Sequence, residues 1–454
     1  MDATLLTGWD ALCQRLSPAF THPTYATFLH LATGWVLCRS KPTVTNLVCT
    51  IGTSLLGQAA KHWTVYERFF YRSVWAMLEV SRLLLVEVVA PLIRTYGLWQ
   101  GIDLAIDDTT CGRCGRHVAF AGYFKDASIS NTLKTVIHWS HNWVIGTVML
   151  RPKRWPTWVI GLPVWFTLYR KPVDCNRQPP FRTRQQIAAQ MIRQTREALP
   201  DWGLRIATDG QYATREVVEA TAGAQSNLVS RIRSDAALYA LPPRRKVGQR
   251  GQPRKKGRRL PTPRQLAARR KKGWHMIKAL LYGKRRKRLV LSIVCLWYHV
   301  GRNRPIKLLI VRDPQGQQKD DYLFCTDSTV GEVEILERFS GRWPIEESIQ
   351  EGKQLEGLET VQGWCKRTVP RQAAMALVVQ TLVKAWYLKH GVKATAAQPK
   401  GTDWQRSKKH PTPLDMLATL RKVLWTDRIN SNSTLKGRVR GLWKTLQFAL
   451  CAAA

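Results

Sequence analysis

Acidic side chains are scarce in this sequence compared with basic ones. The chain has 454 residues, with 31 Asp and Glu against 71 Lys and Arg, so its formal net charge is 71 − 31 = +40. Such a one-sided balance opposes a compact state by self-repulsion unless a polyanion neutralises it in use. We therefore consider nucleic acid first as the partner, and an anionic membrane surface second.

Long apolar runs, an export signal and a cysteine framework are also missing. The most apolar stretch, "VWAMLEVSRLLLVEVVAPLI" at 74–93, is interrupted by charged residues, which predicts an amphipathic packing helix and not a bilayer span. The opening "MDATLLTGWDALCQ" lacks a basic segment and a small-residue cleavage site. Ten scattered cysteines are typical of reduced thiols. We expect a protein of a reducing compartment, without a membrane partner.

The rest of the chain is rich enough in apolar residues, at 44 %, to build two or three domains with proper cores. Residues near 101–240 read as strand, strand, strand, helix, strand, helix, strand, which predicts an α/β fold with a mixed sheet flanked by helices. Changes in pattern predict the following divisions: a helical domain at 1–100, the first part of the mixed-sheet core at 101–240, a β-rich insertion at 241–328, the second part of the core at 329–390, and a helical region at 391–454.

One segment of the predicted insertion is strongly basic. Residues 244–272 carry fourteen Lys and Arg and no Asp or Glu. Because such a segment cannot collapse by itself, we expect a mobile loop that follows a DNA backbone without reading its sequence. A solubilising or tethering segment is the alternative.

Carboxylates follow two predicted buried strands. In "GIDLAIDDTT" the two-residue period places Asp107 and Asp108 on opposite faces, and either could project into a site. In "LRIATDG" the strand leads into Asp209, and Gly210 permits a sharp turn. Ligands bind at the carboxyl ends of strands in open α/β sheets. The alternative is that these residues only cap the elements that follow.

A third acid lies in "FSGRWPIEESIQEGKQLEGLE", residues 339–359. On an unbroken helix, Glu346 would share one stripe with the signature positions Phe339, Arg342 and Lys353. Pro344 fits only the first turn of a helix, so a helix restarting there would leave Arg342 just upstream. A solvated charged face is the alternative explanation of the spacing.

This spacing resembles the Tyr-x2-Arg-x3-Glu-x6-Lys signature of bacterial insertion-sequence DDE transposases of the insertion-sequence-four superfamily, with Phe339 in place of Tyr. "IDDTT" and "ATDGQY" are similar to that group's first and second aspartate sites, and "SKKHPTPLDMLATLRKVLW" to the C-terminal tail of related branches. The resemblance covers roughly residues 100 to 430. It implies a ribonuclease-H-like core interrupted by a β-rich insertion before the glutamate helix, and an N-terminal helical domain that binds DNA.

The resemblance also implies roles for individual residues. Asp108, Asp209 and Glu346 would hold two Mg²⁺ ions, for which Mn²⁺ would substitute; Asp107 is the fallback for Asp108, which the Asp-Thr-Thr match favours. Arg342 and Lys353 would hold phosphates of the cut strand. Trp343 and Trp297 are the candidates for stacking on a flipped base.

The function implied by the resemblance is cut-and-paste transposition. The protein would bind the terminal inverted repeats of its element, pair the two ends as a homodimer, free a 3′-OH, and join it to target DNA, with a hairpin step implied only by family likeness. It would act in the bacterial cytoplasm, on the nucleoid. Two alternatives stay open: a divalent-metal nuclease without strand transfer, and a non-catalytic nucleic-acid-binding protein.

Overall fold

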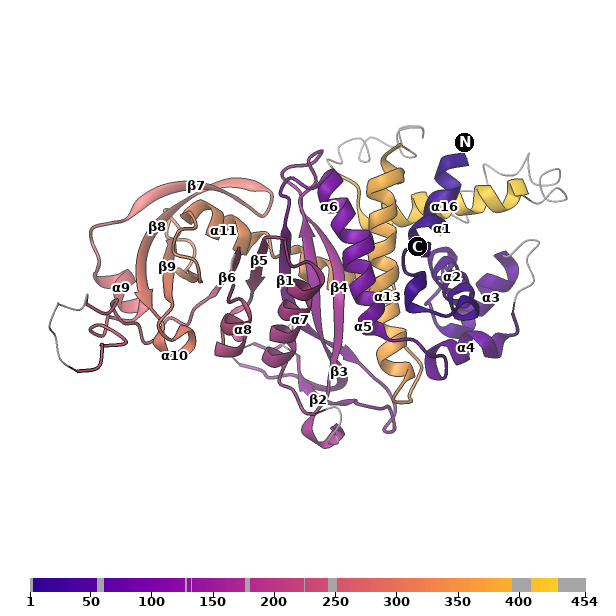
Figure 1. Ribbon diagram of the computed structural model, residues 1–454, viewed down its shortest axis with the longest axis horizontal. Coiled ribbons are helices and arrows are strands. Elements are labelled where there is room, and N and C mark those ends of the chain that lie inside the picture. The colour runs from indigo at the N-terminus through magenta and orange to yellow at the C-terminus, as the bar shows by residue number, and fades with distance from the viewer. Residues whose placement is uncertain are drawn as a thin grey trace.

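The computed structural model has a mixed α/β fold built on one ten-stranded sheet with helices on its faces (Figure 1). It describes residues 3–54, 61–126, 129–131, 133–175, 180–223, 225–243, 251–393 and 410–431. The cysteines in these ranges are free thiols. The predicted fold class, a mixed sheet flanked by helices, is confirmed.

The N-terminal part of the chain is helical, as predicted. Its elements are α1 (Ala3–Gln14), η1 (Ser17–Ala19), α2 (His22–Leu37), α3 (Val44–Ser54), α4 (Trp63–Tyr71), α5 (Met77–Leu83), the π-helical η2 (Leu84–Val89) and α6 (Ala90–Tyr96). The apolar stretch at 74–93 falls in α5, η2 and α6, which pack against the sheet and against α13 (Thr368–Trp386). In the described parts of the chain, no helix is long and apolar enough to cross a membrane.

The ten strands form a single continuous sheet. They are β1 (Ile102–Gly112), β2 (Gly122–Lys125), β3 (Ile137–Leu150), β4 (Ile160–Tyr169), β5 (Leu204–Thr208), β6 (Ser226–Arg231), β7 (His275–Leu281), β8 (Lys284–Leu296), β9 (Pro305–Arg312) and β10 (Asp321–Cys325). In the core, β1 is parallel to β5 and β5 to β6, whereas β3 is antiparallel to both β1 and β4. The order β4-β3-β1-β5-β6 is consistent with the expected ribonuclease-H-like core.

The strands of the predicted insertion do not form a sheet of their own. β10 pairs with β6, and β9, β8 and β7 follow in order, so these strands extend the core sheet. The basic segment is also more ordered than predicted. Residues 251–272 include α9 (Pro263–Arg269), which starts with a capping box between Thr262 and Gln265 and buries Leu266. Burial of that apolar face is the physical reason. Residues 244–250 lie outside the described part.

Helices cover both faces of the core strands. The remaining ones are η3 (Pro172–Asp174), α7 (Arg184–Ala198), η4 (Gly210–Tyr212), α8 (Arg215–Ala220), α10 (Tyr298–Gly301), α11 (Glu332–Ser340), α12 (Pro344–Gln354), the π-helical η5 (Tyr387–Gly391) and α16 (Pro413–Ser431). α7 and η4 contact the face of β1 that carries Asp108, and Arg342, between α11 and α12, contacts the face that carries Asp107. α13 is buried almost throughout.

Candidate active site

The pairing of β1 with β5 brings two of the candidate acids together. The two strands are parallel, with Ile106 beside Thr208. Asp107 and Asp209 come one residue later on each strand, and neighbours at the same level of parallel strands point to the same face. The charge of Asp209 accordingly helps to raise the pKa of Asp107. β5 ends at this point while β1 runs on, and the Asp209 side chain makes no cap hydrogen bond to η4.

Arg342 joins this pair to the third acid. Its Nη1 donates to Asp107 Oδ2 at 2.9 Å, and its Nη2 donates to Glu346 Oε1 at 2.9 Å. α11 ends at Ser340 and α12 begins at Pro344, so Arg342 lies in the turn just upstream of a restarted helix, as Pro344 indicated. Arg342 is 8 % exposed, so one buried guanidinium separates Glu346 from Asp107.

The surroundings of Asp107 make its charge costly. Burial raises the pKa of this carboxyl to about 6, and the charges of Asp108 and Asp209 add to the rise. The Arg342 guanidinium and the backbone N–H of Asp108 act in the opposite direction and lower the pKa. A carboxylate held in this way is stabilised by any additional cation that reaches it.

Asp108, the preferred first ligand from the sequence, points to the other face of β1. Its Oδ2 accepts from Asn142 Nδ2 at 2.9 Å and from Arg184 Nη1 at 2.7 Å. Its Oδ1 accepts from Gln211 Nε2 at 2.5 Å and from the Tyr212 hydroxyl at 2.9 Å. Four donors therefore occupy both oxygens of a side chain that is 8 % exposed.

The structure thus brings the fallback residue, Asp107, and not Asp108, next to Glu346. The strand alternation was read correctly from the sequence, but the Asp-Thr-Thr match gave preference to the wrong face for contact with α12. Neither Asp107 nor Asp108 caps a following element, because β1 continues through both to Gly112.

The other signature residues also lie at this part of the sheet. Lys353, in the last turn of α12, donates from Nζ to the backbone oxygen of Thr110 at 2.6 Å and pairs with Glu359 at 3.1 Å. Phe339 is 8 % exposed, and the guanidinium groups of Arg231 and Arg342 lie 5.2 and 5.9 Å from its ring centre. Phe339 therefore packs beside the guanidinium groups of Arg231 and Arg342 and does not face a ligand.

The two tryptophan candidates differ in exposure. Trp297 is 7 % exposed and packs edge-on against Phe324, so it belongs to the core and is not accessible for stacking. Trp343 is 46 % exposed and lies 6.0 Å from the ring of Tyr282, which is itself 59 % exposed.

Tyr282 was not found from the sequence, because it belongs to a turn more than fifty residues from the signature. Tyr282 and Gly283 both have positive φ and form the two-residue turn between β7 and β8. A Tyr-Gly pair between two strand patterns is the only signal, and it indicates a turn but no contact. The hairpin brings Tyr282 to Trp343, the residue next to Arg342.

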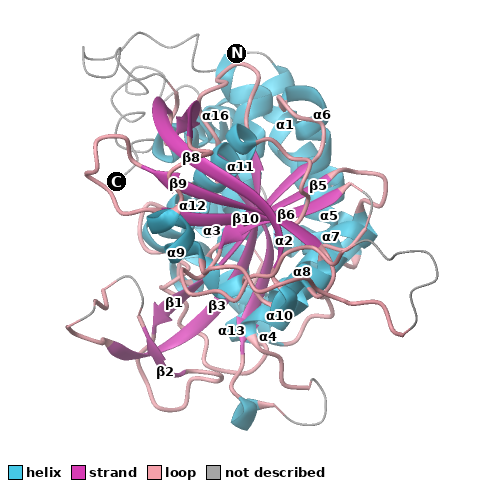
Figure 2. Cartoon of the chain, turned by 90° about the vertical axis from the view of Figure 1, so that its left-hand side faces the viewer, coloured by secondary structure: helices cyan, strands magenta, loops and turns pink. Residues whose placement is uncertain are grey.

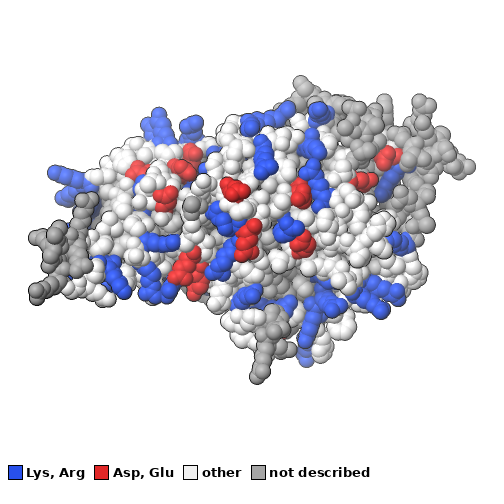
Figure 3. Space-filling model, viewed as in Figure 1, with Lys and Arg blue, Asp and Glu red and all other residues white. Residues whose placement is uncertain are grey.

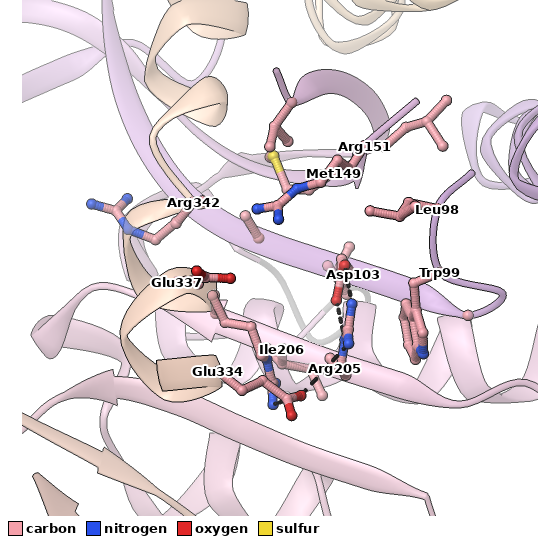
Figure 4. Close-up of a pocket in the computed structure, with 18 of the residues that line it drawn as sticks. Leu98, Trp99, Asp103, Met149, Arg151, Arg205, Ile206, Glu334, Glu337 and Arg342 are labelled. Atoms are coloured by element: carbon pink, nitrogen blue, oxygen red, sulfur yellow. Dashed lines mark hydrogen bonds and ion pairs between the residues drawn. The ribbon is translucent and has the colours of Figure 1, made fainter. Parts of the chain in front are cut away.

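A cavity of about 210 Å³ adjoins the site on the face of Asp107. Figure 4 shows Arg342 at one end of it and Trp99 at the other. Between them Arg205 donates to both oxygens of Asp103, at 2.5 and 2.6 Å, and lies 3.6 Å from Glu334. Its guanidinium stacks 3.5 Å from the Trp99 ring centre. Arg338 also lines the cavity: its Nη1 and Nη2 are buried with no hydrogen-bond partner among the described residues, and Nη1 lies 3.7 Å from Glu334, so the charges here are only partly paired.

The three acids fit a hard divalent cation in kind, since carboxylate oxygens are its preferred ligands. Among the residues that the structure describes, no three His, Cys, Asp or Glu side chains are arranged to enclose an ion as they stand. The guanidinium of Arg342 bonds one oxygen each of Asp107 and Glu346. A positive group thus lies between these two carboxylates.

Comparisons with curated proteins and with solved structures do not identify the family of this chain. Among curated proteins, none matches the chain. Among solved structures, the piggyBac transposase in a synaptic complex with hairpin DNA is similar with a TM-score of 0.39 and 10 % identity, over 96 % of this chain and 82 % of that chain. That similarity is too low to support a statement about this protein.

A family match is more extensive. The model of the family described as DDE superfamily endonuclease matches residues 15–281. This range is more than half of the chain and includes Asp107, Asp108 and Asp209, while Glu346 lies beyond it. The chain therefore belongs to the DDE superfamily endonucleases.

Proposed function

We propose that this protein is a DDE transposase that cleaves DNA at the inverted-repeat ends of an insertion sequence and joins the 3′-OH ends to target DNA. The observation that carries the proposal is that Arg342 joins Asp107 to Glu346, with Asp209 beside Asp107 on the neighbouring strand, in a chain with few acids. These residues come from three distant segments. Convergence of distant carboxylates beside basic groups suits phosphoryl transfer on a polyanion.

In this proposal Asp107 replaces Asp108 as the first metal ligand. Asp107, Asp209 and Glu346 would hold two Mg²⁺ ions, or Mn²⁺ in their place. When bound, the ions would activate the attacking oxygen and stabilise charge on the leaving oxygen. Asp108 would act as a positioning residue that fixes β1 against α7 and η4 through Arg184 and Tyr212.

Two basic residues would hold the DNA strand. The Arg342 fork matches two phosphate oxygens as well as it matches two carboxylates, so it would turn to the phosphate when metal takes over the acids. Lys353 would contact the next phosphates as a point charge near Thr110. The exposed pair of Trp343 and Tyr282, adjacent to Arg342, would stack on a base of the strand.

The finer parts of the function rest on the signature. Phe339, Arg342, Glu346 and Lys353 support placement in the insertion-sequence-four branch, with the ribonuclease-H-like core that this branch implies. Binding of the terminal repeats by residues 1–100, pairing of two ends by a homodimer, and a hairpin step are part of the same proposal. The high positive charge supports DNA as the partner.

The test is a joining reaction. Purified protein, Mg²⁺, linear DNA ending in the inverted repeats that flank its gene, and a supercoiled plasmid are incubated, and the products are separated by size. Joined products are expected. Cuts without joining would instead support a metal-dependent nuclease, the second candidate function, which the same acids would serve.

Matched variants separate catalysis from binding. Asp209→Asn and Glu346→Gln are expected to abolish cleavage and joining while binding to the end DNA stays within about threefold, because both keep the side-chain volume. If both variants keep full activity, the acids are not the catalytic centre. A parent protein that binds the end DNA but neither cuts nor joins it would instead support a non-catalytic nucleic-acid-binding protein.

A further inference from the structure

The face of the sheet that carries Asp107 continues beyond the proposed active site. On β1 this face passes through Thr109 and Cys111, which pair with Trp143 and His141 on β3. Two residues further along β3, Trp139 keeps the same face and pairs with Tyr123 on β2. Directly paired residues of antiparallel strands point to the same side. The acids and the ring pair therefore share one face.

Among the described residues, this face is largely open on the outer hairpin of β2 and β3, although Trp139 is half-buried. Tyr123 is 67 % exposed and Ile137 is 59 % exposed. The rings of Tyr123 and Trp139 lie edge to face with centres 5.2 Å apart, and Trp139 Nε1 donates to the backbone oxygen of Gly115 at 3.1 Å. In Figure 2 the ends of β1, β2 and β3 project together beyond the helices.

The opposite face of the hairpin is packed. Phe124, between Tyr123 and Lys125, lies edge-on to Tyr169 at 5.9 Å, and Lys171 Nζ lies 4.9 Å from the Phe124 ring centre. Lys171 also donates to the backbone oxygen of Tyr123 at 3.2 Å. These contacts hold the hairpin from one side and fix the rings of the other side toward solvent.

The charge around the open face is positive. Lys125 is on this face, and Lys134 and Arg116 are exposed nearby in the chain. Asp126, the acid next to Lys125, accepts a hydrogen bond from the Thr110 hydroxyl at 3.3 Å and lies 3.6 Å from His138. Figure 3 shows Lys and Arg side chains along the described part of the lower edge of this view.

We propose that the Tyr123–Trp139 face binds unpaired DNA bases of the strand that leaves the catalytic acids past Lys353. Exposed rings interleaved with cations are the chemistry of single-strand binding, in which bases stack and phosphates meet positive charge. Arg113, whose backbone N–H bonds to the Trp139 carbonyl, is six residues from Asp107, about 20 Å along an extended strand. The open face is thus a second contact, separate from the metal ligands.

This inference rests on the proposed function for its choice of DNA strand. A second copy of the chain is a poorer occupant, because each copy carries +40 charges and the cations around the face would repel it. Duplex DNA is also a poorer occupant, since its bases are already stacked and offer no free ring face.

The test is DNA binding by the full-length protein without metal. Fluorescence anisotropy in EDTA measures the Kd of the protein for a labelled oligo-dT of twelve nucleotides and for a duplex of the same length. Tyr123→Ala is expected to weaken oligo-dT binding by about 5- to 100-fold, the loss of one base stack, and to change duplex binding less than about threefold. Tyr123→Phe keeps the ring and is expected to stay within about twofold of the parent protein.

Two further measurements make the result decisive. Leu133→Ala, on the same hairpin at 97 % exposure, removes an apolar side chain without a ring and is expected to have no effect. Iodouracil in the oligonucleotide is expected to crosslink to Tyr123 or Trp139 in the unmodified protein. Unchanged oligo-dT affinity of a folded Tyr123→Ala protein, or crosslinks only elsewhere, overturns the inference.

Other outcomes are distinguishable. A Tyr123→Ala protein that loses self-association in sedimentation, with unchanged oligo-dT affinity, overturns the inference in favour of a copy–copy interface. Failure of the proposed function appears instead as Mg²⁺-dependent cleavage that survives Glu346→Gln, and it leaves the metal-free binding result untouched.

Discussion

Asp107 and Asp108 are neighbours in the sequence, but they lie on opposite faces of β1 and have different hydrogen-bond partners. Asp108 receives four hydrogen bonds from side chains around it, including one from a cation, Arg184. Asp107 receives one side-chain hydrogen bond, from Arg342, and one backbone N–H. The first carboxylate is satisfied within the protein, whereas the second shares the Arg342 guanidinium with Glu346.

In the proposed function, this difference separates a positioning role for Asp108 from a catalytic role for Asp107. A carboxylate whose oxygens are all occupied has no lone pair to offer a metal, and its hydrogen bonds rigidify the strand. A buried carboxylate with a raised pKa and a shared cation is stabilised by a ligand that brings positive charge. The two aspartates are adjacent in the sequence and differ only in the face of β1 to which each side chain points.

The largest expected effect is on catalysis. Asp107→Asn is expected to slow DNA cleavage by at least about 10³-fold, because a metal ligand contributes several kcal/mol to transition-state stabilisation. Asp108→Asn is expected to slow it by less than about tenfold. Single-turnover cleavage of a labelled end fragment measures both rates. The reverse order of the two effects would break the comparison and restore Asp108 as the ligand.

The second prediction concerns stability. Asp108→Asn leaves Arg184 without its partner and three further donors without a charged acceptor, so we expect the free energy of unfolding to fall by about 1–3 kcal/mol. Asp107→Asn is expected to leave it equal or higher near pH 8. The reason is that the folded pKa of Asp107, about 6, lies above its ordinary 3.8. The ionised form therefore opposes folding above pH 6, and this penalty fades as pH falls toward 3.8.

Urea unfolding of the three proteins at one pH gives these differences directly. Repeating it between pH 4 and 8 sharpens the comparison, since the gap between Asp107→Asn and the parent protein is expected to close toward low pH. A larger loss from Asp107→Asn than from Asp108→Asn at pH 8 would contradict it.

The third prediction is a pH limb. Because Asp107 must lose its proton to bind metal, Mg²⁺-dependent cleavage is expected to rise about tenfold between pH 5 and 7 and to level off above. Arg342→Ala removes a charge that lowers this pKa, so the midpoint for Mn²⁺ binding, measured by calorimetry, is expected to move up. Asp108→Asn removes a charge that raises it, and the midpoint is expected to move down. A midpoint near pH 4 in the parent protein would contradict the assignment.

The smallest expected effect concerns the hydrogen bonds that surround Asp108. Gln211→Ala removes one exposed donor to Oδ1 and leaves Tyr212 in place, so we expect a loss of about 0.5–1 kcal/mol in unfolding free energy. Cleavage is expected to stay unchanged within about twofold. A Gln211→Ala protein with strongly reduced cleavage but normal stability would give the Asp108 face a catalytic role.

Local features of the sequence predicted several residues of the proposed site. Few acids, the spacing of Arg342, Glu346 and Lys353, and Pro344 as a helix start are local features, and the helix does begin at Pro344. The mixed sheet followed from alternating strand and helix patterns. Local spacing fixes such features because a helical turn or a strand pleat needs only neighbouring residues.

Three features follow from the tertiary structure and not from the sequence. Asp107, and not Asp108, bonds to the Arg342 that also holds Glu346, and the strands after residue 274 extend the core sheet. Trp297 is buried against Phe324, whereas Trp343 is exposed beside Tyr282. Strand alternation predicts that the two aspartates lie on opposite faces but does not say which face contacts α12. Long-range packing decides this, because it places α12 on one side of β1 and α7 on the other.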